Sequence, residues 1–79
     1  MKITIIYLET AMLISKKQYD SWREIQDEYP DFITSLGPWN EEDVASYLNS
    51  EYPRLNPSAS EQAASLITGE YVSLTLNFE

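Results

Sequence analysis

Residues 71–78 alternate strictly between two kinds of side chain, and this pattern constrains the fold more than any other in the chain. One set is wholly apolar and consists of Val72, Leu74, Leu76 and Phe78. Successive side chains of a β-strand point to opposite faces of a sheet, so a period of two indicates a strand with one buried and one solvated face. Such strands are typical of antiparallel sheets. We therefore expect the core to form on an antiparallel sheet.

The N-terminal segment predicts two further strands. Residues 2–8 are rich in β-branched and aromatic types, which favours a strand that is buried on both faces and lies at the centre of the sheet. Residues 11–14 are the second candidate, with Glu9 and Thr10 near a tight connection. That connection lacks the Asn-Gly or glycine residues that two-residue hairpin loops favour. The hairpin therefore depends on the two strand patterns alone.

A first helix is predicted from Ser15 to Tyr29. Ser15 and Gln18 have the spacing of a capping box, and Pro30 disfavours helical geometry at the residue before it. At about 100° per residue, one arc of this helix forms the stripe expected to face the core. The stripe consists of Tyr19, Trp22, Ile25, Gln26 and Tyr29. Tyr19 and Trp22 are accordingly expected in the core.

A second helix is predicted to begin after Asn40, which is a favoured N-cap residue. Trp39 is placed to pack on Val44 as a hydrophobic staple across the start of this helix. Residues 32–36 are interpreted as a short apolar turn that the Gly37-Pro38 pair breaks.

A third helix is predicted after Ser58, which forms a capping box with Glu61, and Gly69 has the position of a C-terminal cap. The resulting order is β-β-α-α-α-β. It predicts an α+β fold with a small antiparallel sheet of about three strands and three helices packed on one face. Residues 1–79 are expected to form a single domain.

The residue types that most catalytic and metal sites require are missing. The chain has no histidine and no cysteine, which removes the usual general base, the thiolate nucleophile and the common zinc ligands. Gly37 and Gly69 are its only glycines, and neither belongs to a phosphate-binding loop. The acidic clusters lack the spacing of a calcium loop. We expect no enzyme, no metal and no cofactor.

The sequence also predicts a cytoplasmic protein. Without cysteine there is no disulfide framework of the kind found in small secreted domains. The apolar run of residues 3–8 is too short for a signal peptide or a membrane span.

The charge of the chain is strongly negative and unevenly distributed. The net charge is −8, from 13 acidic and 5 basic residues. Residues 1–17 contain all three lysines but only Glu9 among the acids. The remaining chain therefore repels nucleic acid and anionic membranes, and it favours a partner with a basic surface. The alternative is that the acids only keep a small protein soluble.

Acidic side chains follow one side of the predicted first helix. They lie opposite its apolar stripe and form a row of Asp20, Glu24, Asp27 and Glu28. Asp31 extends this row if the helix or its following turn continues. Acids spaced i,i+4 repel by about 0.2–0.5 kcal/mol per pair. The helix dipole disfavours a negative charge in the last turn by roughly 0.3–1 kcal/mol. Every amphipathic helix needs a polar face, but stability alone does not favour this arrangement, which indicates a binding surface.

A second acidic cluster follows Trp39 in the sequence GPWNEEDV. Glu41, Glu42 and Asp43 fall in the first turn of the predicted second helix, where the helix dipole favours negative charge. The helix dipole is therefore sufficient to account for these three acids. They are interpreted as a possible extension of the surface centred on Asp27 and Glu28.

The chain resembles small acidic inhibitors encoded by phages, such as anti-CRISPR proteins and DNA mimics. The resemblance lies in its size, its charge, its lack of cysteine and the acidic ladder of Asp20, Glu24, Asp27, Glu28 and Asp31. The resemblance implies an inhibitor that acts in the host cytoplasm by binding a protein partner. The partner would have a basic nucleic-acid-binding groove, and a CRISPR effector complex is one such partner. The inhibitor would contact neither nucleic acid nor membrane.

An ordinary interaction domain is the alternative. An antitoxin-like or immunity-like protein would have similar features. A homodimer could form on an open sheet edge at residues 75–78. The oligomeric state is accordingly left open between monomer and homodimer.

Overall fold

The structure is a computed structural model that describes residues 2–78. These residues contain four strands and three helices. Their order along the chain is β1 (Lys2–Leu8), β2 (Met12–Ser15), α1 (Trp22–Glu28), β3 (Phe32–Asn40), α2 (Glu41–Glu51), α3 (Ala59–Thr68) and β4 (Ser73–Thr75). All strand pairs are antiparallel, and the strand order is β3-β1-β2-β4. The predicted α+β class is confirmed, and β1 lies inside the sheet as its apolar sequence indicated.

The sheet has one strand more than the three predicted, because residues 32–40 form β3. The interpretation of residues 32–36 as a turn was therefore wrong. β3 is an edge strand paired only with β1, and an edge tolerates the missing N–H of Pro38. Gly37 has a φ of 102°, and a Cβ there would lie 2.9 Å from the carbonyl oxygen of Ile3. The Gly37-Pro38 pair thus bends a strand and does not end it.

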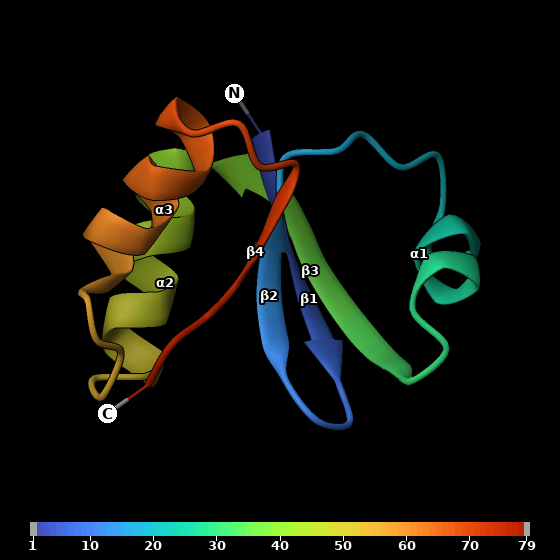
Figure 1. The fold of residues 1–79 in the computed structure, drawn as a ribbon, viewed down its shortest axis with the longest axis horizontal. Coiled ribbons are helices and arrows are strands. Elements are labelled where there is room, and N and C mark those ends of the chain that lie inside the picture. Colours follow the sequence, from blue (N-terminus) through green and yellow to red (C-terminus); the bar gives the residue numbers. More distant parts are fainter. Residues whose placement is uncertain (1, 79) are drawn as a thin grey trace.

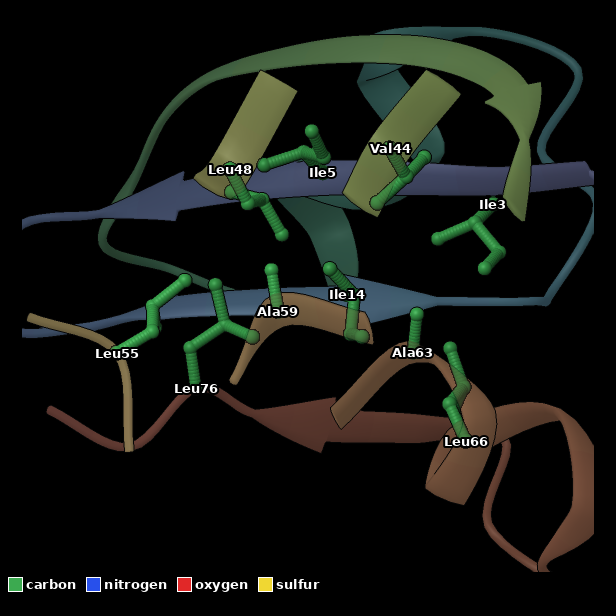
Figure 2. Close-up of a cluster of buried hydrophobic side chains, with 10 residues drawn as sticks. All are labelled: Ile3, Ile5, Ile14, Val44, Leu48, Leu55, Ala59, Ala63, Leu66 and Leu76. Atoms are coloured by element: carbon green, nitrogen blue, oxygen red, sulfur yellow. The ribbon is translucent and has the colours of Figure 1, made fainter. Parts of the chain in front are cut away.

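Helices cover both faces of the sheet, with α2 and α3 on one side and α1 on the other (Figure 1). The prediction of three helices on one face was therefore wrong. The larger core lies under α2 and α3 and includes Ile3, Ile5 and Ile14 from the sheet (Figure 2). The smaller core consists of Ile6, Leu13 and Ile25. Consecutive apolar residues in β1 and β2 supply one side chain to each face, so each face requires its own cover.

The first helix is much shorter than predicted. Ser15 ends β2 instead of capping a helix, and its buried Oγ accepts a hydrogen bond from the Lys17 N–H. Residues 16–21 form an irregular segment before α1 begins at Trp22. Ile25 is the one buried residue of α1. Tyr19 packs at the edge of the smaller core, whereas Trp22 is 54% exposed, so its predicted core position was wrong.

The start of α2 and both ends of α3 follow the sequence closely. Asn40 immediately precedes α2, although its side chain makes no capping hydrogen bond. Trp39 packs against the larger core and lies edge-on to Tyr47, with ring centroids 5.5 Å apart. Ser58 caps α3, and its Oγ accepts a hydrogen bond from the Glu61 N–H at 3.3 Å.

The C-terminal segment is bound to α3 as well as to the sheet. β4 covers only residues 73–75, and the chain then passes over the N-terminal end of α3. Gln62 is 2% exposed, and its side-chain amide exchanges two hydrogen bonds with the backbone of Asn77, at 2.9 and 3.0 Å. The same Nε2 also donates to the Pro57 carbonyl oxygen at 2.7 Å. One buried amide therefore fixes the last described residues against the helical layer.

No helix within residues 2–78 has both the length and the apolar character needed to cross a membrane.

Candidate acidic interaction surface

The five acids of the predicted ladder do not lie on one helix. Glu24, Asp27 and Glu28 belong to α1, while Asp20 lies in the segment before it and Asp31 in the turn before β3. The i,i+4 pair of Asp20 and Glu24 is thus not a helical pair. All except Asp31 are exposed. The ladder is replaced by a three-residue acidic face on α1 with one acid beyond each end.

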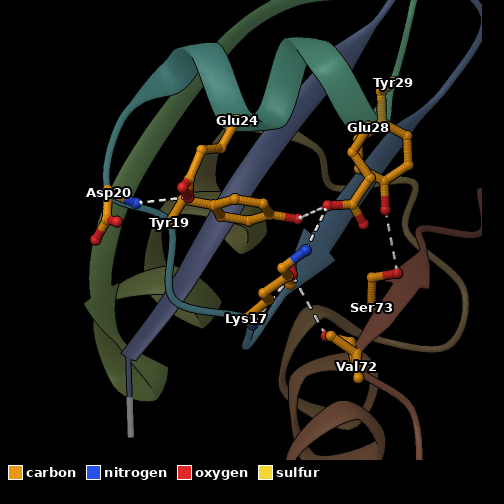
Figure 3. A network of polar contacts seen from close by, with 9 residues as sticks. Lys17, Tyr19, Asp20, Glu24, Glu28, Tyr29, Val72 and Ser73 are labelled. Atoms are coloured by element: carbon orange, nitrogen blue, oxygen red, sulfur yellow. Dashed lines mark hydrogen bonds and ion pairs between the residues drawn. The ribbon is translucent and has the colours of Figure 1, made fainter.

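Glu28 is partly neutralised by a lysine from outside the helix. Its Oε2 lies 2.9 Å from Lys17 Nζ and accepts a hydrogen bond from Tyr19 Oη at 3.2 Å (Figure 3). The hydrogen bond to Glu28 raises the pKa of the Lys17 ammonium. Burial raises the pKa of the Tyr19 phenol, and the Glu28 charge adds to that rise. Lys17 therefore compensates part of the negative charge that the helix dipole disfavours in the last turn of α1, whereas Asp27 in the same turn has no such partner.

Two of the other acids have local hydrogen-bonding roles. Glu24 Oε1 accepts a hydrogen bond from the Asp20 N–H at 3.0 Å, close to the start of α1. Asp31 Oδ2 accepts one from Thr10 Oγ1 at 3.1 Å, which connects the turn before β3 to the loop between β1 and β2. Among residues 2–78, Asp27 makes no side-chain hydrogen bond or ion pair. It is the member of the set with the fewest structural constraints.

Asp27 lies in a shallow hollow with its two acidic neighbours. The hollow is lined by Lys17, Glu24, Asp27 and Glu28 and has a volume of about 510 Å³. Its walls hold three carboxylates and one ammonium. It therefore offers charged hydrogen-bond acceptors, with Lys17 as the only donor in its lining that carries a positive charge.

The second predicted acidic cluster lies elsewhere. Glu41, Glu42 and Asp43 form the first turn of α2, and α2 packs on the face of the sheet opposite α1 (Figure 1). Glu41 and Glu42 line a hollow of about 410 Å³ that extends to Ser60 of α3. The cluster is therefore a separate acidic surface, and its interpretation as an extension of the Asp27 surface was wrong.

Few of the basic residues remain to balance this charge. Lys17–Glu28 is the one salt bridge within residues 2–78. Lys16 Nζ donates hydrogen bonds to the carbonyl oxygens of Leu66 and Gly69, where it neutralises the C-terminal end of α3. The Arg23 guanidinium lies 5.5 Å from the centre of the Trp22 ring. Three of the five bases are thus already engaged, and most of the carboxylates have no ionic partner in the described chain.

Three tyrosines converge on the side of the larger core, and sequence reasoning did not group them. Tyr7 Oη and Tyr47 Oη are 3.0 Å apart, and Tyr52 Oη donates to Tyr7 Oη at 3.4 Å. Burial, followed by these hydrogen bonds, raises the pKa of Tyr7 well above its ordinary value. The cluster joins β1 to α2 and its C-terminal end. No periodicity could have revealed it, because Tyr7 lies on β1, about 40 residues away from Tyr47 in the sequence.

Groups of three or more acidic residues close enough to hold a metal ion are absent from residues 2–78. No protein-family model matches the chain, and no curated protein or solved structure is significantly similar to it.

Proposed function

We propose that the protein is a non-enzymatic inhibitor that binds the basic, nucleic-acid-binding surface of a host protein complex. The observation that carries the proposal is the unbalanced charge of the folded chain. It has a net charge of −8, and Lys17–Glu28 is the one salt bridge in residues 2–78. The exposed carboxylates therefore offer complementary charge to a partner that supplies lysine or arginine.

The acidic face of α1 is the proposed contact. Its members Glu24, Asp27 and Glu28 are exposed and lie around one hollow. Duplex DNA presents one negative charge per about 1.7 Å of its axis, and proteins bind it largely through lysine and arginine. Carboxylates held on a helix can occupy the same basic side chains. In this scheme a base of the partner contacts Asp27 directly and competes with Lys17 for Glu28.

An anti-CRISPR protein that blocks DNA binding by a CRISPR effector complex is the specific form of inhibitor that we propose. Such a complex holds nucleic acid in a positively charged channel. The protein would then act in the cytoplasm of the host cell and require no cofactor.

The test is a DNA-binding assay with purified CRISPR effector complexes and three forms of this protein. Asp27→Lys should reduce inhibition by roughly tenfold or more at low salt, because it replaces an unpaired carboxylate at the contact with a repelling charge. Glu51→Lys is the matched control: it makes the same charge change at an exposed position on α2, on the other side of the sheet. Inhibition by this control should remain within about twofold of the parent.

Salt provides the second arm of this test. Inhibition should weaken as the ionic strength rises, since exposed charges more than about 10 Å apart are screened at 0.1 M salt. If Asp27→Lys and Glu51→Lys lose inhibition equally, the effect depends on net charge and not on the acidic face of α1. Inhibition that is insensitive to salt would contradict the proposal.

A homodimer through β4 is the second candidate, favoured by two exposed apolar side chains beside that edge. Tyr71 and Val72 are 60% and 54% exposed. The edge predicted at residues 75–78 is closed at Asn77, whose N–H and carbonyl oxygen are bonded to Gln62 and Asn56. A dimer would have to use residues 71–75. A monomer mass in light scattering at all concentrations would eliminate it.

A further inference from the structure

The outer edge of β3 is unpaired within residues 2–78. β3 pairs with β1 on one side and has no strand on the other. Alternate N–H and C=O groups of such an edge point away from the sheet, where they can pair with another extended chain. β3 is also longer than β4, the strand at the other edge.

Two exposed apolar side chains flank this edge. Trp22 of α1 is 54% exposed and Ile33 of β3 is 59% exposed. They line a groove of about 330 Å³ between the helix and the strand, together with Gln26, Phe32, Thr34 and Ser35. A second hollow of about 210 Å³ shares Trp22 and Ser35 and continues to Pro38. The groove therefore follows β3 over most of its length.

Irregularities in the β1–β3 register limit how much of the edge can pair. Leu8 pairs with Phe32 and Tyr7 with Thr34, so Ile33 is an extra residue with no partner on β1. A second irregularity lies at Gly37 and Pro38, opposite Thr4. The regular part of the edge is residues 34–36. This length suits a short peptide segment, and bulges of this kind oppose continuous pairing between two sheets.

The charges around the groove favour a basic segment as its occupant. Asp20 lines the second hollow, Asp31 immediately precedes β3, and residues 32–40 carry no charge. A second copy of the chain would bring another net charge of −8 to the same place and be repelled. An extended segment with apolar side chains between lysines or arginines complements both the groove and the acids around it.

We propose that β3 binds a short, extended, basic segment of a partner protein by strand addition, with Trp22 and Ile33 as the apolar contacts. Main-chain hydrogen bonds to residues 34–36 supply the pairing, and alternate side chains of the segment enter the groove. The proposal goes beyond the inhibitory role of α1 and stands without it, because it depends on the backbone of β3, on apolar side chains and on the charges of Asp20 and Asp31, and not on Asp27.

The experiment uses a short synthetic peptide of alternating lysine and valine, titrated into the isotope-labelled protein and followed by NMR. We expect the amide resonances of residues 34–36 to shift. The same peptide methylated on every backbone nitrogen should lose binding, because neither of its edges then has an N–H group to donate to β3. A peptide of alternating glutamate and valine should bind at least about tenfold more weakly, a difference of about 1.4 kcal/mol.

Matched substitutions distinguish this edge from the other one. Trp22→Ser and Ile33→Ser should each weaken peptide binding severalfold, whereas Val72→Ser and Tyr71→Ser, which are equally exposed beside β4, should not. The proposal is overturned if the peptide shifts no resonance of residues 34–36 at millimolar concentration, or if the methylated peptide binds equally well. A doubling of mass that Ile33→Ser abolishes would instead identify a second copy as the occupant, and would overturn it too.

Discussion

Lys17, in the segment that joins β2 to α1, pairs with Glu28 in the last turn of α1, with Nζ and Oε2 2.9 Å apart. The pair connects an irregular stretch of chain to the C-terminal turn of a seven-residue helix. It also removes part of the negative charge from the face that we propose as the contact. The same lysine therefore supports α1 and competes with a basic partner for Glu28.

Replacing Lys17 should separate these two effects. Lys17→Met should leave the thermal midpoint close to that of the parent, because exposed ion pairs contribute little to stability. It should strengthen binding to a basic partner at low salt, since Glu28 no longer has a competing base. Lys2→Met is the control, as it makes the same charge change at an exposed residue with no ion pair in residues 2–78. If Lys2→Met strengthens binding equally, the effect belongs to net charge and not to Glu28.

Gln62 should be one of the most sensitive polar positions in the chain. Gln62→Leu keeps a similar volume but removes the bonded partner of the Asn77 N–H and of the Pro57 carbonyl oxygen, while the Asn77 carbonyl oxygen keeps only the Asn56 N–H. An unsatisfied buried polar group costs about 1–3 kcal/mol. We expect a loss of at least that size in the free energy of unfolding, measured by urea denaturation. Gln26→Leu, at an exposed site on α1, should change stability by no more than about 0.5 kcal/mol.

The two tryptophans should report two different environments. Trp22 is exposed and Trp39 is packed beside Tyr47, so acrylamide should quench the fluorescence of Trp22 first. Trp22→Phe should leave a protein whose emission is shifted to shorter wavelength and is harder to quench. Trp39→Phe should do the opposite. Equal quenching of the two variants would contradict the exposed position of Trp22.

Tyr7 should be the last tyrosine to ionise as the pH rises. Its folded-state pKa lies above the ordinary value of 10.0, so folding favours the neutral phenol. The stability that this difference contributes is fully present below pH 10.0 and is lost as the pH rises from there toward the folded-state pKa. Tyr7→Phe should flatten that part of the stability curve. Ultraviolet absorbance of tyrosinate, followed with urea denaturation at each pH, measures both effects.

Elements that local interactions define were predictable from the sequence. The Ser58 cap placed the start of α3, and the apolar run of residues 2–8 placed β1 inside the sheet. Ser15 had the spacing of a helix cap as well, but pairing with β1 extends β2 through Ser15, and its hydroxyl bonds elsewhere. Tertiary contacts therefore overrode a local signal that was valid in itself.

β3 could not be predicted because the residues at its irregularities resemble a turn between two elements. Gly37 and Pro38 usually interrupt regular structure, and only the edge position makes both tolerable. The cover on the second face of the sheet was missed, although the sequence contained a signal for it. Leu13 and Ile14 are adjacent apolar residues, so in a strand they point to opposite faces, and both are buried. The two acidic clusters could be located in the sequence, but the sequence did not show that they lie on opposite faces of the sheet. That division depends on which face α1 covers.

The small core under α1 gives the two faces of the sheet different resistance to opening. Ile25 is the one residue of α1 in a core of three buried residues, whereas the core under α2 and α3 contains ten. Local unfolding follows the number of buried apolar contacts. Amide hydrogens of α1 should therefore exchange with solvent well before those of β1. The side of the molecule that carries Asp27 and Trp22 can thus adjust its shape to a bound surface while the α2 and α3 side stays intact.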